Sequence, residues 1–287
     1  MAVTIESEAL HAEISPRGAE LTALRRIGTG DLLWNGDPAF WTGRSPLLFP
    51  IVGRVRGNYI QVDDRHYPLP QHGFARTRTF TLIETARDRC RWSLPWDDDT
   101  LAQFPFPFRL EVSYHISGTT LAIAADVLNE GDGILPVSFG YHPAFRWPLP
   151  CATGRAEHTI TFSTSEPAGI RRPVDGLLSA NRYESPLEGQ SLVLRDGLFE
   201  AGALIWDELA SRSVVYTAPG APKIIVEFDG LPQLGIWTKP GAGFVCIEPW
   251  HGYADPEGFS GEFRDKPGLA ILGTHEQRRF AMTIRVD

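Results

Sequence analysis

Hydrophobic and polar residues alternate at every second position along much of this 287-residue chain. In segment 108–116 one set of alternate positions carries Phe108, Leu110, Val112, Tyr114 and Ile116, whereas the positions between them are polar. After turn residues at 118–120, the same alternation resumes over 121–127. A period of two places one face of a strand in a core and the other in solvent, so these segments predict an antiparallel hairpin.

The alternation recurs over 224–228, before a turn at Asp229-Gly230, and over 280–286 at the C-terminus. There is no long amphipathic helical stretch, and we expect at most single helical turns near 38–42 and 98–103. The 28 glycines and 23 prolines are scattered rather than gathered in a linker. Many short strands with turns between them predict an all-β fold, a large antiparallel β-sandwich, with residues 1–287 forming one domain.

The composition of the chain limits the classes of partner that it is expected to bind. The formal net charge is −8, which argues against nucleic acid or an anionic membrane as the main partner. No apolar run approaches the roughly 20 residues that span a bilayer, and the N-terminus has no basic start followed by an apolar run. The three cysteines are an odd number without a CxxC spacing, which favours reduced thiols. We therefore expect a cytoplasmic protein with no signal peptide, and the sequence leaves its oligomeric state open.

Several familiar motifs are missing. GxSxG, GxGxxG and the phosphate-binding GxxxxGK[ST] do not occur, so a serine hydrolase elbow or a nucleotide site has no support. HExxH and clustered His/Cys spacings are absent as well. We expect neither a cofactor nor a metal.

Three segments instead place ionisable residues among glycine, proline and aromatic residues, a context typical of a strand end or loop that lines a cleft. The first, 45–79, contains Gly53-Arg54-Val55-Arg56 and the run QHGFAR at 71–76. The second, PVSFGYHPAFRWP at 136–148, is centred on His142. The third, VCIEPWHGYAD at 245–255, is centred on Glu248.

Each candidate has an ordinary structural alternative. A histidine in a β protein is usually structural or exposed, and Glu248, which follows four apolar residues, could form a buried salt bridge with an arginine. Trp147 and Trp250 could stack on a sugar ring, although core packing is the default for tryptophan. Read separately, the three segments do not establish that they meet in space.

Taken together and in this order, the segments resemble the aldose 1-epimerase (galactose mutarotase) family, most closely its shorter bacterial branch. The resemblance is carried by PLLFPIVGR at 46–54, LPQHGFAR at 69–76, GYHPAF at 140–145 and EPW at 248–250. It extends over nearly the whole chain. It implies a galactose mutarotase-like supersandwich with the site on its concave face.

The resemblance also implies roles for individual residues. His142 matches the catalytic histidine, Glu248 the catalytic glutamate and His72 the other site histidine. A substrate-binding arginine is expected, and Arg54, Arg56 and Arg76 all remain open. The family's substrate-binding aspartate falls on Gly202 here, and Asp207 would replace it only in a shifted alignment.

The implied reaction is the exchange of the α and β anomers of a free aldose without a cofactor. Glu248 would remove the proton from the C1 hydroxyl, while His142, its pKa raised by the neighbouring carboxylate, would protonate the ring oxygen. We expect the two side chains to face each other across a cleft, about the width of a sugar ring apart.

Three other functions remain open. The nearest is a hexose-6-phosphate 1-epimerase, in which Arg54, Arg56, Arg76 and Arg78 could hold a phosphate. A glycoside hydrolase or lyase would normally need a second carboxylate beside Glu248. A non-catalytic carbohydrate-binding protein would need no acid–base pair.

Overall fold

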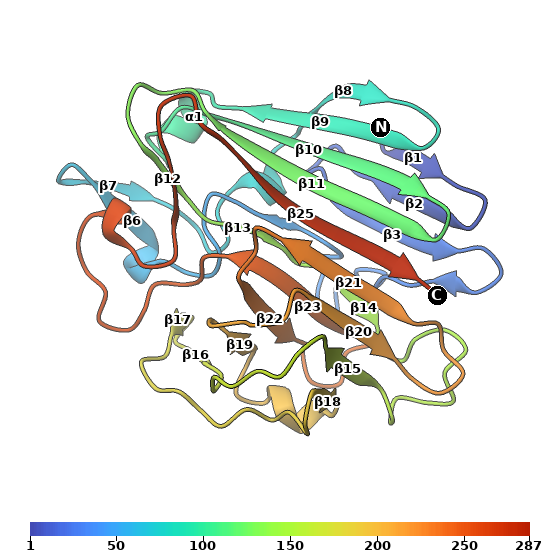
Figure 1. Ribbon diagram of the computed structural model, residues 1–287. Coiled ribbons are helices and arrows are strands. Elements are labelled where there is room, and N and C mark those ends of the chain that lie inside the picture. Colours follow the sequence, from blue (N-terminus) through green and yellow to red (C-terminus); the bar gives the residue numbers. More distant parts are fainter.

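A computed structural model describes residues 1–287, and its largest element is a nine-stranded sheet in which all strand pairs are antiparallel. In spatial order its strands are β18 (Ser191–Val193), β15 (Thr159–Phe162), β20 (Ser213–Thr217), β21 (Ile224–Asp229), β25 (Gln277–Val286), β11 (Thr120–Asn129), β10 (Phe108–Ser117), β9 (Arg89–Pro95) and β8 (Thr81–Thr85). Figure 1 shows the C-terminal strand β25 lying between the β10–β11 hairpin and β21.

A second sheet of six strands carries the segments that matter for function. Its strands are β19 (Leu204–Trp206), β22 (Gln233–Trp237), β23 (Phe244–His251), β13 (Phe139–Tyr141) and β5 (Leu47–Leu48), with β14 (Ala144–Arg146) also paired to β23. Four N-terminal strands form a third sheet: β1 (Val3–Glu6), β2 (Leu10–Ile14), β3 (Leu21–Arg26) and β4 (Gly30–Asp31). Three two-stranded ribbons complete the strands: β6 (Tyr59–Val62) with β7 (Arg65–Pro68), β12 (Leu135–Val137) with β24 (Ala270–Leu272), and β16 (Pro173–Val174) with β17 (Leu177–Leu178).

The alternation in the sequence has the expected structural consequence. Strands β10 and β11 pair in one register from Phe108 opposite Asn129 to Ser117 opposite Thr120. Along β11 every second side chain is buried, and β25 alternates in the same way. The hairpin, the C-terminal strand and the strand over 224–228 are therefore confirmed. The alternating face packs into the core because only that face carries enough apolar area to be removed from water.

The nine-stranded and six-stranded sheets pack face to face. Phe139 in β13 stacks on Phe280 in β25, with ring centroids 5.3 Å apart. The hydroxyl of Tyr141, also in β13, donates to the backbone carbonyl of Phe280 at 2.8 Å. A single cluster of 65 buried residues runs from Ile5 to Val286. The predicted all-β, antiparallel sandwich is confirmed.

Helical structure is confined to short turns. The one α-helix, α1 (Asp98–Leu101), lies in the predicted segment 98–103, and its capping box joins Asp97 to Thr100. Segment 38–42 contains a hydrogen-bonded turn rather than a helix. The 3₁₀ turns are η1 (Arg56–Asn58), η2 (Ala75–Thr77), η3 (Asp196–Phe199) and η4 (Phe263–Asp265). No helix has the length and apolar character needed to span a membrane.

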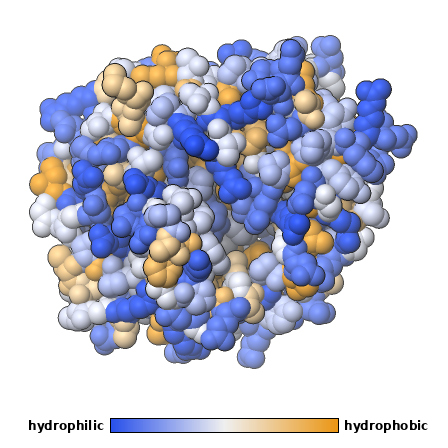
Figure 2. Space-filling model, turned by 180° about the vertical axis from the view of Figure 1, so that it is seen from behind, coloured by the Kyte–Doolittle hydropathy of each residue, from blue (hydrophilic) through white to orange (hydrophobic).

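Figure 2 shows the face opposite that of Figure 1. Hydrophilic side chains cover most of it, and apolar side chains appear only in small scattered patches.

Candidate active site

The register of the six-stranded sheet brings two candidate residues together. In β13, Gly140 pairs with Trp250 of β23, and in β14, Ala144 pairs with Cys246 of the same strand. In an antiparallel pair of strands, the residue numbers of opposite partners always add up to the same total, and these two pairs share that total. Strands β13 and β14 therefore keep one continuous register against β23. That register sets His142 opposite Glu248, and side chains opposite each other in an antiparallel pair lie on the same face and within contact distance.

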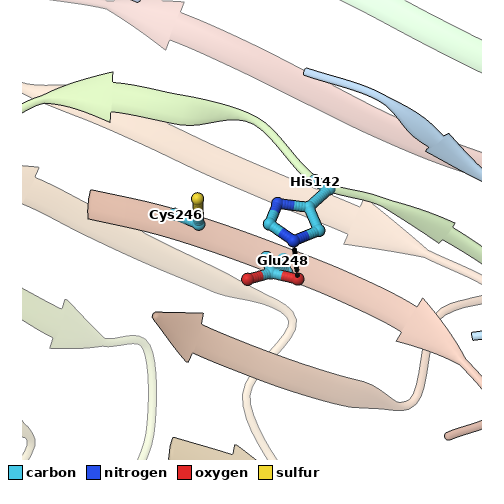
Figure 3. Close-up of side chains that lie close together, drawn as sticks. All are labelled: His142, Cys246 and Glu248. Atoms are coloured by element: carbon cyan, nitrogen blue, oxygen red, sulfur yellow. Dashed lines mark ion pairs between the residues drawn. The ribbon is translucent and has the colours of Figure 1, made fainter. Parts of the chain in front are cut away.

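His142 and Glu248 make direct contact. Nε2 of the imidazole lies 3.0 Å from Oε2 of the carboxyl group, and the two side chains are only 8% and 3% exposed. Figure 3 shows the imidazole ring, which follows β13, lying against the carboxyl group on β23. The expected separation by about one sugar-ring width is therefore wrong. The strands that carry the two residues are hydrogen-bonded neighbours rather than opposite walls of a cleft.

Burial dominates the protonation of this pair. It lowers the pKa of His142 to about 3 and raises the pKa of Glu248 well above its ordinary value. The expectation that the carboxylate raises the pKa of His142 is wrong, because removal of the imidazole from water outweighs it. The pair as a unit binds one proton at neutral pH, since a second proton or the loss of the first would leave a buried net charge.

Aromatic rings surround the imidazole. The ring of Trp41 lies 4.9 Å from that of His142 at an interplanar angle of 33°, and Trp237 meets it edge-on at 6.0 Å. His72 approaches from another side, with ring centroids 5.8 Å apart. These apolar faces displace water from the imidazole, which is the physical cause of its lowered pKa.

His72 is held by a tight turn. His72 and Gly73 both have positive φ, of 65° and 67°. A Cβ on Gly73 would lie 2.2 Å from the carbonyl oxygen of Phe49, so only glycine fits there. Nδ1 of His72 accepts a hydrogen bond from the backbone N–H of Gly53 at 3.1 Å. This bond assigns the proton of a neutral His72 to Nε2. Burial and the neighbouring His142 lower the pKa of His72 well below its ordinary value.

Arg76 follows in turn η2 and is half-buried. Its Nη2 donates to the backbone carbonyl of Gln71 at 2.8 Å, and no carboxylate lies within ion-pair distance. Burial lowers the pKa of the guanidinium from its ordinary value, but leaves it charged at neutral pH. Its remaining N–H donors are free for a ligand oxygen.

These side chains line one cavity of about 350 Å³, within the size range of small-molecule sites. Its polar lining comes from Gln71, His72, Arg76, His142 and Glu248, and Glu248 is the only carboxylate that lines it. Its apolar and aromatic lining includes Trp41, Val52, Pro173, Leu177, Ala203, Ile205, Trp237, Trp250 and Ala254. All three segments singled out in the sequence thus contribute to it.

Arg54 and Arg56 lie outside this cavity. Arg54 donates from Nε to the side-chain oxygen of Asn58 at 2.9 Å and from Nη1 to the carbonyl of Asp175 at 3.3 Å. Asp175 belongs to the turn of the β16–β17 ribbon, whose neighbouring residues line the cavity. Arg56 instead donates to the carbonyl of Phe259 and lines a separate pocket of about 90 Å³. Of the three arginines, only Arg76 reaches the candidate site.

Two positions were candidates for the substrate-binding aspartate, Gly202 and Asp207. Gly202 lines the cavity, but a Cβ there would lie 2.6 Å from Cγ of Pro173, so Pro173 fills the space of a side chain. Asp207 lies outside the lining and forms ion pairs with Arg171 and Arg182. Trp147 is buried in the core beneath Arg155, whereas Trp250 lines the cavity.

One group of residues could hold a metal ion. His142, Cys246 and Glu248 offer ligand atoms within 4.8 Å of one another, and Figure 3 shows Cys246 beside Glu248 on β23. An ion there would have to replace the His142–Glu248 contact and ionise a thiol whose pKa burial raises. Nδ1 of His142 also lacks the partner that usually orients a metal-bound imidazole. The arrangement fits an acid–base pair better than a metal centre.

The sequence reasoning missed Trp41, Trp237 and the β16–β17 ribbon. An isolated tryptophan carries no motif, and the ribbon reaches the cavity only through tertiary contacts. The tryptophans could have been found only as aromatic residues in a sugar-binding context.

Comparisons with known proteins agree with the fold. The family model for aldose 1-epimerase matches residues 1–266. The chain is 31% identical over 278 residues to protein LacX (plasmid) of Lactococcus lactis subsp. lactis, with 93% of each chain covered. A galactose mutarotase related enzyme from Lactobacillus acidophilus is 28% identical and superposes with a TM-score of 0.94 over 100% of this chain and 97% of that chain.

A galactose mutarotase-like protein from Lactobacillus casei ATCC 334 gives a TM-score of 0.92 at 26% identity, with 100% of both chains covered. The predicted galactose mutarotase-like fold is thereby confirmed. The family model and the LacX relative both extend over more than nine-tenths of the chain. This chain therefore belongs to the aldose 1-epimerase family.

Proposed function

We propose that this protein is an aldose 1-epimerase that interconverts the α and β anomers of a free aldose, with His142 and Glu248 as its acid–base pair. The observation that carries the proposal is the 3.0 Å contact between Nε2 and Oε2 inside a cavity of sugar size. The family supplies the reaction class, and the geometry of the pair supports the mechanism.

The reaction needs one acid and one base acting on two oxygens of the same carbon. The O1–H bond breaks as C1 gains a double bond to O1, while the C1–O5 bond breaks and O5 gains a proton. The open aldehyde turns about the C1–C2 bond, and the reverse steps close the ring on its other face. Because O1 and O5 are both bonded to C1, the two catalytic groups must themselves lie close together. Adjacent side chains suit this reaction better than groups a ring-width apart.

A single shared proton is sufficient for the cycle. In the resting pair, burial favours a neutral imidazole and a neutral carboxyl group. Transfer of that proton across the 3.0 Å contact gives a Glu248 carboxylate and a His142 imidazolium. The carboxylate then removes the proton of O1, and the imidazolium protonates O5. The positive charge of Arg76 adds to burial in opposing protonation of His142, so the imidazolium forms only transiently.

His72 and Arg76 would position the sugar. A neutral His72 carries its proton on Nε2, which lies 3.3 Å from the side-chain amide nitrogen of Gln71, and Arg76 has free guanidinium donors. These polar groups together can bind hydroxyl oxygens. Trp41 and Trp237 would pack on the apolar face of the ring.

Hydrolysis of a glycosidic bond is less well supported than anomer exchange. It normally uses two carboxylates across the bond, and Glu248 is the only one that lines the cavity. The phosphate-sugar alternative rests on four arginines, of which only Arg76 lines the cavity. Arg78 instead pairs with Asp99.

The test is polarimetry of freshly dissolved α-D-galactose and α-D-glucose with and without the purified protein. We expect anomer equilibration to be accelerated in proportion to protein concentration. His142→Ala at the same concentration controls for a contaminating mutarotase. A rate equal to that in buffer for both sugars contradicts the proposal.

A further inference from the structure

The titratable and amide side chains of the cavity are gathered around the His142–Glu248 pair. The ring of His72 lies 5.8 Å from that of His142, and Arg76 donates to the backbone carbonyl of Gln71 at 2.8 Å. With the pair itself, these are the five titratable or amide side chains in the lining. One end of the cavity is therefore polar.

A row of residues across the six-stranded sheet leads away from this polar end. Glu248 of β23 lies opposite Gly235 of β22, and Gly235 lies opposite Ile205 of β19. Because opposite residues share a face, Ile205 lies on the same face of the sheet as Glu248 and His142. At a strand spacing of about 4.8 Å, it stands about 10 Å from Glu248. The floor of the cavity is therefore aliphatic at this distance from the pair.

The β16–β17 ribbon adds to the apolar end, and Figure 1 shows it beside β19. Pro173 and Leu177 of the ribbon line the cavity, as does Ala203 next to β19, and all three are partly exposed. Arg171, just before the ribbon, exchanges two backbone hydrogen bonds with Ile205, at 2.8 and 3.1 Å. The ribbon is thus fixed to the sheet. We call Pro173, Leu177, Ala203 and Ile205 the apolar wall.

The apolar wall has no side chain that can hydrogen-bond, and backbone groups around it are already paired. Both backbone groups of Ile205 bond to Arg171. The N–H of Gly202 donates to Phe199, and its carbonyl accepts from Arg172. A hydroxyl group against this wall would lose its hydrogen bonds to water without replacement, whereas a C–H group would remove apolar surface from water.

We propose that the preferred substrate is a deoxy aldose that lacks the hydroxyl group facing the apolar wall, at C3, C4 or C6. This inference rests on the proposed function, which places C1 and O5 at the His142–Glu248 pair. C2 is bonded to C1, so its hydroxyl group stays beside the polar end. C3, C4 and C6 are bonded to neither C1 nor O5, so these carbons are the ones that reach the wall.

The test measures kcat/KM by polarimetry for a hexose and its 2-, 3-, 4- and 6-deoxy derivatives, each value divided by the spontaneous rate constant of the same sugar. The parent is whichever of D-galactose and D-glucose the wild-type protein equilibrates faster. We expect the 3-, 4- or 6-deoxy derivative to exceed the parent by about 10–100-fold, which is the discrimination that an apolar site achieves against an added hydroxyl group. The 2-deoxy derivative should not exceed the parent.

Leu177→Asn tests the wall itself, because it adds a hydrogen-bonding group at a partly exposed position. It should reduce the preference for the deoxy sugar by about 3–10-fold, as expected for one new hydrogen bond to the hydroxyl group. Val174→Asn is the matched control, since Val174 lies opposite Leu177 in the same ribbon, is exposed and does not line the cavity. It should keep the wild-type preference. Thermal unfolding checks that both variants are folded, and Ala203→Ser tests the same wall with a smaller change.

The outcomes separate this inference from the proposed function. A wild-type protein that accelerates none of the five sugars contradicts the proposed function. A wild type that accelerates them but favours none of the 3-, 4- and 6-deoxy derivatives over the parent overturns the substrate assignment alone. An equal gain for the 2-deoxy derivative also overturns it. So does an undiminished preference in both Leu177→Asn and Ala203→Ser, because the wall is then not its cause.

Discussion

Nε2 of His142 lies 3.0 Å from Oε2 of Glu248 because β13 and β14 continue one antiparallel register against β23. Neither side chain could be moved to a neighbouring position without turning it to the other face of the sheet. The fold thus determines the contact between His142 and Glu248, and burial makes the pair share one proton.

Removing either member of the pair should abolish most of the activity. We expect His142→Ala and Glu248→Gln each to lower kcat for mutarotation by about 100-fold or more, since a general acid or base contributes about 10²–10⁴-fold. His66→Ala, at an exposed histidine in β7, should be unaffected. If both site variants keep near-wild-type kcat, the pair is not the acid–base catalyst.

The pH profile should lack the usual histidine limb. His142 takes up a second proton only near its lowered pKa of about 3, and the pair loses its single proton only above the raised pKa of Glu248. His72 stays neutral over the same range. We therefore expect kcat/KM to show no acid limb in the ordinary histidine range and to fall only as pH rises through the raised pKa of Glu248. An acid limb with a midpoint near the ordinary histidine pKa of about 6.5 would contradict this protonation scheme.

Glu248 should cost stability at neutral and alkaline pH. Its pKa in the folded protein is raised above the ordinary 4.5, so the unfolded chain releases a proton that the folded chain retains. The stability that this proton contributes is present below pH 4.5 and is lost as pH rises through the folded pKa. Glu248→Gln does not titrate and keeps a donor for His142. We expect it to raise the free energy of unfolding by about 1 kcal/mol at about pH 8.

Denaturant unfolding at about pH 8 and at about pH 4 measures this difference. The gain should shrink at the lower pH, where Glu248 is protonated in both states. A variant that is less stable than wild type at about pH 8 would mean that Glu248 is not a net cost to the fold.

Local patterns predicted the strands but could not predict the geometry of the site. The β10–β11 hairpin follows from alternation because its partner strands are adjacent in sequence. The contact of His142 with Glu248 depends instead on the pairing of strands about 100 residues apart. No local period encodes that register, so the sequence alone suggested two walls of a cleft.

The choice among the arginines shows the same limit. The sequence places Arg54 in the family's GR motif, yet its guanidinium contacts Asp175, a residue 121 positions away, on the β16–β17 ribbon. Arg76 reaches the cavity because turn η2 directs it there after His72 and Gly73, which both have positive φ. A motif identifies candidate arginines, whereas the packing of the surrounding loops decides which guanidinium group reaches the cavity.

Arg54 should therefore support the ribbon rather than the chemistry. We expect Arg54→Gln to raise KM by about 3–10-fold, because Pro173 and Leu177 of the ribbon line the cavity, and to change kcat little. Steady-state kinetics on the faster of the two aldoses measures both constants. A large loss of kcat with unchanged KM would instead place Arg54 at the reacting atoms.

The last prediction concerns the class of substrate, a neutral aldose rather than a sugar phosphate. Arg76 is the only cationic side chain that lines the cavity, and the net charge of −8 gives no long-range attraction for a dianion. A phosphate would depend strongly on this guanidinium and on ionic strength, because the interaction is charge-assisted. A neutral sugar would be held by directional hydrogen bonds and by packing on Trp41 and Trp237.

The measurement is kcat/KM for galactose and glucose against glucose 6-phosphate, at low and high salt, for wild type and Arg76→Gln. For wild type we expect a preference for the free sugars that varies little with salt. Arg76→Gln should lower kcat/KM for them about 10-fold, as expected for loss of a hydrogen bond from a charged donor. A wild-type preference for the phosphate of about 100-fold, equivalent to roughly 2.7 kcal/mol, that fades with salt and disappears in Arg76→Gln would assign the cavity to sugar phosphates.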